Sequence, residues 1–134
     1  MRSLLLCGLI ACVTAPGCDS ATPAEKREAV TGKVTLDGVP LPEGTISFDV
    51  GDGAVPGNAT IRDGSYSVAA KSGKNRVVIR AFRIDPSVKI STDPAAPIDG
   101  RVNYLRATYN DKTTLSADVG ATKVFDFALL SAPK

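Results

Sequence analysis

The chain contains three cysteines, whose thiols can act as strong nucleophiles. It contains no histidine. Cys7 and Cys12 lie within the apolar run 4–13, and Cys18 follows it. Without histidine, a Ser-His-Asp arrangement cannot form and the usual general base is missing. The commonest protein ligand of zinc is missing too. The residues therefore predict no catalytic site, no metal site and no cofactor.

Carboxylates are the remaining groups that could hold an ion. Asp49 precedes the glycine-rich segment 51–58 and Asp52 lies in it, and Asp93 and Asp99 lie in a proline-rich stretch. Their spacing does not match the calcium loop of an EF-hand. Aspartate beside glycine is more typical of turns, but calcium on a surface loop stays open as an alternative. A carboxylate pair for glycoside cleavage is not excluded by composition, but no motif marks one.

Aromatic and basic residues alternate in one segment, Arg-Val-Asn-Tyr-Leu-Arg-Ala-Thr-Tyr. This segment joins a long predicted loop to the last strands, and binding residues are frequent on such connections. It is the best candidate for a recognition surface, and packing of the loop against the domain is the alternative. The candidate residues are Arg101, Tyr104, Arg106 and Tyr109.

The first seventeen residues have the order of a secretory signal peptide. One positive charge in Met1-Arg2-Ser3 precedes ten mostly apolar residues, 4–13, and small residues follow. A stable membrane-spanning helix needs about 20 apolar residues, so the run is too short to span a bilayer. We therefore expect residues 1–17 to direct export and to be removed.

The end of this segment, Ala15-Pro16-Gly17-Cys18, resembles the lipobox of bacterial lipoproteins. The resemblance implies cleavage before Cys18, alkylation of its thiol by diacylglycerol and further acylation, for example with palmitate. It also implies a membrane-anchored protein that faces the periplasm or the cell exterior. The mature chain would keep Cys18 as its one cysteine, so no internal disulfide is expected. Ordinary cleavage that leaves Cys18 unmodified is the alternative.

Polar residues follow the lipobox and are typical of a tether. Residues 18–29 have no apolar period and contain four consecutive charged residues of both signs. The whole chain has 16 basic and 14 acidic residues, a formal net charge of +2. Nucleic acid is therefore not expected as a partner, because phosphate binding needs a concentrated basic surface.

Residues 30–131 read as one β-domain, because short runs with a period of two alternate with turn dipeptides. Asp37-Gly38 and Asp63-Gly64 are turn signals, and residues 85–103 read as a long loop. Val77, Val78 and Ile79 lie in a run that is apolar on both faces, as expected of a central strand. About seven strands and no helix predict a two-sheet antiparallel β-sandwich. The expected strands are 30–37, 45–50, 59–62, 65–68, 75–84, 113–119 and 123–130, with the last two paired around Gly120.

Several of these motifs together resemble carboxypeptidase regulatory-like domains. The opening Val30-Thr-Gly-Lys-Val-Thr-Leu-Asp-Gly-Val-Pro-Leu-Pro-Glu-Gly-Thr-Ile-Ser-Phe48, the hairpin 63–68 and the segment 72–79 are similar to that family. The residues around Tyr109 and the final 125–129 resemble small bacterial lipoproteins that carry this domain. The resemblance implies a seven-stranded transthyretin-like, immunoglobulin-like sandwich used as a scaffold or binding module, without the zinc site of the peptidases.

Three functions follow as hypotheses. The first is a non-catalytic, lipid-anchored extracytoplasmic module for binding or envelope structure, with a protein or glycan partner that the sequence does not identify. The second is a subunit of an assembly that pairs through exposed sheet edges. The third is a hydrolase on a transthyretin-like scaffold, similar to 5-hydroxyisourate hydrolases. Those enzymes depend on histidine, which this chain lacks.

Overall fold

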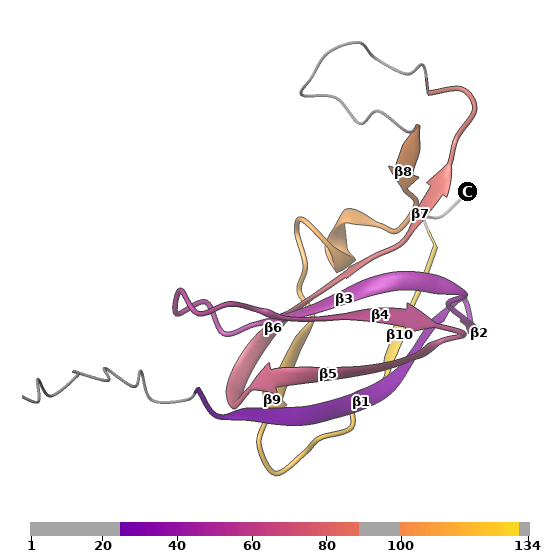
Figure 1. Ribbon diagram of the computed structural model, residues 1–134. Helices are drawn as coiled ribbons and strands as arrows, with labels where there is room; N and C mark the ends of the chain where they lie inside the picture. Colours follow the sequence, from indigo (N-terminus) through magenta and orange to yellow (C-terminus); the bar gives the residue numbers. More distant parts are fainter. Residues whose placement is uncertain (1–24, 89–99, 132–134) are drawn as a thin grey trace, which may run out of the picture.

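The protein is all-β in the computed structural model, which describes residues 25–88 and 100–131 (Figure 1). The expected signal peptide (1–17), Cys18 and most of the tether lie outside the described residues. The first strand begins at Arg27, so the last three residues assigned to the tether belong to a strand. No α-helix occurs in the described ranges, and one 3₁₀ turn, η1, spans Ala107–Tyr109.

Ten strands are formed within these ranges. Their bounds are β1 Arg27–Leu36, β2 Val39–Pro40, β3 Glu43–Asp49, β4 Gly57–Arg62, β5 Ser65–Lys71, β6 Gly73–Arg80, β7 Phe82–Ile84, β8 Arg101–Asn103, β9 Ser116–Val119 and β10 Phe127–Leu129.

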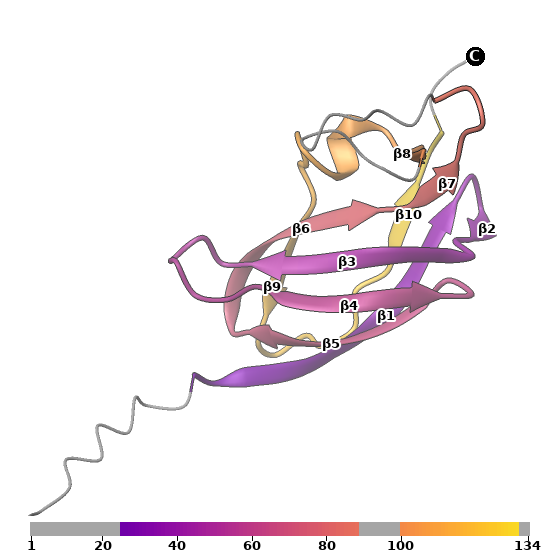
Figure 2. The same ribbon diagram turned by 45° about the horizontal axis from the view of Figure 1, so that its top comes forward.

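Eight of the strands form one curled sheet with the order β10-β1-β5-β4-β3-β6-β9, and β2 pairs with β1 (Figures 1 and 2). All neighbours along this path are antiparallel except β1 and β10, which are parallel. Both predicted aspartate-glycine turns are confirmed: Asp37, Gly38, Asp63 and Gly64 have positive φ values of 52°, 82°, 48° and 74°. This left-handed conformation favours glycine and tolerates aspartate.

The expected pairing of the last two strands with each other is wrong. β9 pairs with β6, and β10 pairs with β1 at the other end of the sheet path. The intervening residues cross from one sheet end to the other, and there Phe125 N–H donates to Thr31 C=O at 3.0 Å. Alternation of apolar and polar residues indicates that two segments are strands, but it does not show which strand each one pairs with.

The core forms a single cluster to which nearly every strand of the curled sheet contributes. The inward residues expected for the long run are confirmed, with Val77, Ile79 and Ala81 fully buried and Val78 only 7% exposed. Alternation predicts inward side chains for nine more members, Val30, Val34, Ile46, Phe48, Tyr66, Ala117, Val119, Phe127 and Leu129, and Ile61 and Val68 join the cluster without having been predicted.

A close seam joins β1 to the C-terminal segment. The Tyr66 hydroxyl on β5 donates to the Phe125 carbonyl at 2.7 Å. This contact crosses β1 at Gly32, where a Cβ atom would lie 1.8 Å from the same carbonyl oxygen. Burial raises the pKa of the Tyr66 hydroxyl above its ordinary value, so it remains a donor at any physiological pH. The seam therefore requires glycine at position 32.

The long central strand predicted over 75–84 is divided. β6 ends at Arg80, and after the buried Ala81 the chain continues as β7, which pairs with β8 in a separate two-stranded sheet. β8 lies in the stretch predicted as a loop. Its three residues, Arg-Val-Asn, contain a single apolar side chain, so no period of two could reveal it.

Candidate functional site

A cleft opens where β7 separates from β3. One side consists of the start of β3 and the outer face of β4, with Glu43, Gly44, Thr45 and Thr60. The other side is the β7–β8 hairpin, which stands above the sheet end in Figure 2 and contributes Phe82, Arg83, Ile84 and Arg101. The last β3–β6 pair is Thr45 with Arg80. Beyond that pair the two strands diverge, and the cleft fills the space between them.

The hairpin side of the cleft carries exposed apolar surface. Phe82 is 50% exposed and Ile84 is 74% exposed, both on β7. Ile84 is opposite Arg101 in the register, and Phe82 is opposite Asn103, so these side chains share one face of the hairpin. Exposed apolar residues gathered beside an arginine are typical of an interaction site.

Arg83 occupies the other face of the hairpin. Its guanidinium carbon lies 5.9 Å from the centre of the Tyr104 ring, within the range of a cation–π contact. Tyr104 packs against the core with its ring half-buried, so the contact holds Arg83 in place. The nearby Asp85 carboxylate accepts from the N–H and hydroxyl of Ser87, at 2.9 and 2.6 Å. The hydrogen bonds from Ser87 hold the pKa of Asp85 below its usual value.

The structure brings together only part of the predicted recognition surface. Arg101 lines the cleft. Tyr104 does not line it, but its ring contacts Arg83, which does. Tyr109 instead packs against the core, and its hydroxyl accepts from Leu130 N–H at 3.1 Å. Arg106 is exposed and precedes η1, where its carbonyl accepts from Tyr109 N–H at 3.0 Å. These last two residues support the η1 turn and do not line the cleft.

Sequence reasoning missed Phe82, Arg83 and Ile84 as surface residues. They continue an apolar run, and the run was assigned as a whole to the buried centre of the sheet. The only available signal was Arg83 itself, since a charged residue between two apolar ones in a supposedly buried strand favours an edge.

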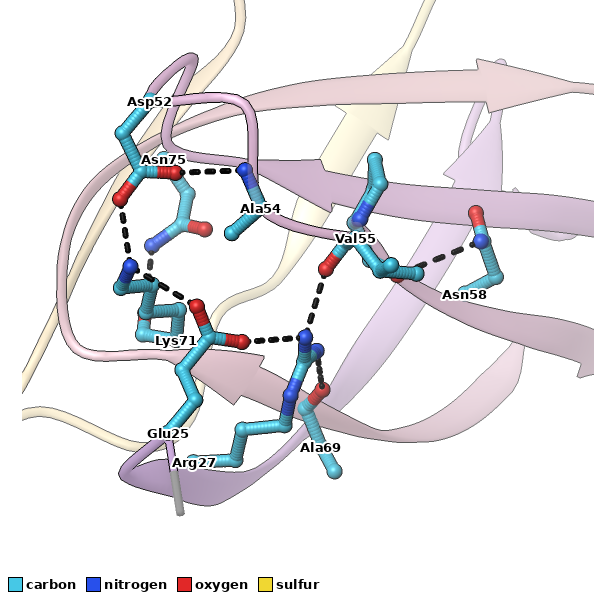
Figure 3. Close-up of polar contacts among 10 residues, drawn as sticks. Glu25, Arg27, Asp52, Ala54, Val55, Asn58, Ala69, Lys71 and Asn75 are labelled. Carbon is cyan, nitrogen blue, oxygen red and sulfur yellow. Dashed lines mark hydrogen bonds and ion pairs between the residues drawn. The ribbon is translucent and has the colours of Figure 1, made fainter. Parts of the chain in front are cut away.

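Charged residues also gather at the opposite end of the sheet, where β1 begins (Figure 3). The Lys71 ammonium contacts Asp52 at 2.5 Å and Glu25 at 2.8 Å. Arg27 contacts Glu25 at 2.6 Å and donates to the Val55 carbonyl at 2.6 Å. Hydrogen bonds from Lys71 lower the pKa values of Glu25 and Asp52, and Asp52 in turn raises that of Lys71. This network ties the start of β1 to β5 and to the β3–β4 loop.

These contacts bear on the calcium alternative. The Asp49 carboxylate accepts from Gly51 N–H at 2.8 Å, and Asp52 is held by Lys71 and by Ala54 N–H. Within 25–88 and 100–131, no three cysteine or acidic side chains are grouped as metal ligands. Asp93 and Asp99 lie outside the described residues. The contacts at Asp49 and Asp52 are those of Asx turns and ion pairs.

Among the described residues no helix is long and apolar enough to cross a membrane. Comparison with protein-family models, with curated proteins and with solved structures finds no match.

Proposed function

We propose that this chain is the precursor of a lipid-anchored, extracytoplasmic binding module without enzymatic activity. The cleft beside β7 is the observation that carries the proposal. It combines exposed Phe82 and Ile84 with Arg101 and with Arg83, which the Tyr104 ring holds in place. Surface of this composition resembles the core of a protein interface. No histidine is present to act as a general base.

The finer fold assignment belongs to this proposal. A curled, mainly antiparallel sheet around one core is compatible with a transthyretin-like β-sandwich of the carboxypeptidase regulatory-like kind. In such a module the sheet is a scaffold, and the hairpin and loops carry the binding residues. A binding role or a structural role in the cell envelope is therefore favoured over a hydrolase.

The anchor part of the proposal rests on Cys18. Replacing it with serine (Cys18→Ser) is expected to abolish labelling by radioactive palmitate and to move the protein from the membrane to the soluble fraction after cell fractionation. One acyl chain gives only marginal membrane binding, with about 0.8 kcal/mol per buried methylene, so removal of all chains should release the protein. Cys12→Ser is the matched control and should leave both readouts unchanged. Palmitate labelling that persists in Cys18→Ser would contradict the anchor.

The cleft can be tested in cells that express the protein. A photo-crosslinking amino acid at position 84 is expected to capture a partner, because Ile84 is 74% exposed at the cleft. The same amino acid at position 124 is the control, since Val124 is 61% exposed but lies on the C-terminal segment beside β1. Equal crosslinking at both positions, or none at position 84, would contradict a binding role for the cleft.

A further inference from the structure

We propose that the outer edge of β7 binds an extended peptide segment as an added antiparallel strand. The segment places an acidic residue opposite Arg83 and apolar residues on either side of it. This inference rests on the proposed binding function of the cleft and names the class of ligand. It follows from the direction of the backbone groups in β7, from the charge at its centre and from its exposed apolar side chains.

The backbone groups of the β6–β7 segment can be assigned to two sides. Val77 N–H donates to Leu115 C=O at 3.0 Å. Ala81 N–H is directed at Asn103 Oδ1 at 3.4 Å, and Ala81 C=O accepts from Tyr104 N–H at 3.1 Å. The backbone hydrogen-bonding groups of Val77 and Ala81 therefore point toward the side of β8 and β9. In a β-strand this direction alternates from residue to residue.

The alternation leaves an open edge on β7. Asp85 N–H donates to Gly100 C=O at 2.9 Å, so residues 81, 83 and 85 bond to the β8 side. The N–H and C=O groups of Phe82 and Ile84 must then point to the β3 side. There β3 has already diverged, and no described residue bonds to these groups from that side. Unpaired strand edges of this kind accept an added strand.

The charge at the centre of this edge argues against a second copy of the chain as the occupant. Antiparallel pairing that uses all three residues of two β7 edges would place Phe82 opposite Ile84 of the other copy, and Arg83 opposite Arg83 in the non-hydrogen-bonded position. Side chains are closest in that position, and like charges directly opposite each other are destabilising. A carboxylate in the same position would instead be attracted to Arg83.

The apolar side chains define the residues on either side of the acid. Phe82 and Ile84 are 50% and 74% exposed and lie on one face of the hairpin. Cross-strand apolar pairs stabilise a sheet, so apolar side chains are expected opposite both residues. The N–H and C=O groups of Phe82 and Ile84, which have no partner among the described residues, match a partner with an extended main chain. The ligand is therefore a peptide with the pattern apolar-acidic-apolar in its sequence.

The test uses the full-length protein in detergent and the fluorescein-labelled peptide Lys-Thr-Val-Glu-Val-Thr-Lys. Saturable binding is expected by fluorescence anisotropy. N-methylation of both valines removes the N–H groups that face β7 and is expected to weaken binding at least tenfold. N-methylation of the glutamate is the matched control, because its N–H points away from β7, and it should leave the affinity unchanged.

Charge reversal tests the register. Replacing the glutamate of the peptide with lysine is expected to weaken binding at least tenfold, and Arg83→Glu in the protein should restore it. Arg62→Glu, at an exposed arginine of β4, is the control that should not restore it. No binding, equal loss from both N-methylated peptides, or self-association of the protein through β7 in sedimentation equilibrium would overturn the inference. The proposed function would survive this failure if crosslinking at position 84 still captures a partner.

Discussion

Replacing Gly32 with alanine is expected to lower the free energy of unfolding by at least about 3 kcal/mol, the upper range for an overpacked core. A Cβ atom at this position would lie 1.8 Å from the Phe125 carbonyl oxygen and 2.9 Å from the Tyr66 hydroxyl oxygen. The first contact is with backbone, which cannot rotate away as a side chain can. The C-terminal segment must therefore shift away from β1, and its hydrogen bond from Tyr66 is expected to be lost. Urea denaturation of the purified variant measures the effect.

Gly120→Ala is the matched control for this prediction. Gly120 also lies in the C-terminal segment, but a Cβ atom there meets nothing within 4 Å, and its φ is outside the left-handed region. Its free energy of unfolding is expected to stay within about 0.5 kcal/mol of the wild-type value. A Gly32→Ala protein as stable as Gly120→Ala would show that the seam between β1 and residues 123–129 does not have the described geometry.

Asn75→Asp is expected to destabilise the domain by about 3–5 kcal/mol at pH 7, the cost of an uncompensated buried charge. Asn75 is fully buried, and its Nδ2 donates to the Lys71 carbonyl at 2.9 Å (Figure 3) and to the Gly73 carbonyl at 2.8 Å. Its Oδ1 has no partner among the described residues. An ionised carboxylate there would donate to neither carbonyl and would repel both. The β5–β6 turn would then lose the contacts that close it.

The pH dependence identifies the cause of this effect. Burial against carbonyl oxygens favours the neutral acid, so the folded-state pKa of the introduced carboxyl is raised above its unfolded value of about 3.9. The folded state then binds the proton more tightly than the unfolded state does. The destabilisation relative to wild type is therefore smallest below about pH 4 and grows as the pH rises. Thermal unfolding of both proteins between pH 3 and 7 measures this difference.

Asn75→Leu separates the charge from the lost hydrogen bonds. The leucine side chain has no N–H groups to donate to the carbonyls of Lys71 and Gly73. Leaving these carbonyls unpaired is expected to lower the free energy of unfolding by about 1–3 kcal/mol. No ionisable group is introduced, so its difference from wild type should not change with pH. A pH-independent loss in Asn75→Asp would contradict the buried charge and would leave the lost amide hydrogen bonds as the cause of the destabilisation.

Much of the strand pattern could be predicted from local sequence. Alternation placed Val30 and Val34, and Ile46 and Phe48, on the buried face, and the aspartate-glycine dipeptides marked two turns correctly. These features are encoded by neighbouring residues, because a strand alternates faces at every residue and a left-handed turn needs glycine or a short polar residue. The partners of β9 and β10 could not be predicted in this way, since pairing depends on how far the whole sheet curls.

The residues of the candidate site could also be predicted only in part from the sequence. Arg101 and Tyr104 are predicted as candidates because an aromatic and basic segment joins a long loop to the last strands. Phe82 and Ile84 were assigned to the interior, because a continuous apolar run cannot reveal where a strand leaves its sheet. Their exposure follows from the divergence of β7 from β3, a property of the assembled sheet.

The sequence by itself determined the all-β class, the turns, most of the core and the absence of histidine, because each depends on residue type or on neighbours along the chain. It also carries the expectation of export and of an anchor at Cys18, which lies outside the described residues. Only the tertiary structure decided that residues 123–129 cross to β1 over Gly32, and that one edge of β7 has no strand partner within 25–88 and 100–131. Both depend on contacts between segments far apart in sequence, and those contacts exist only once the sheet has curled.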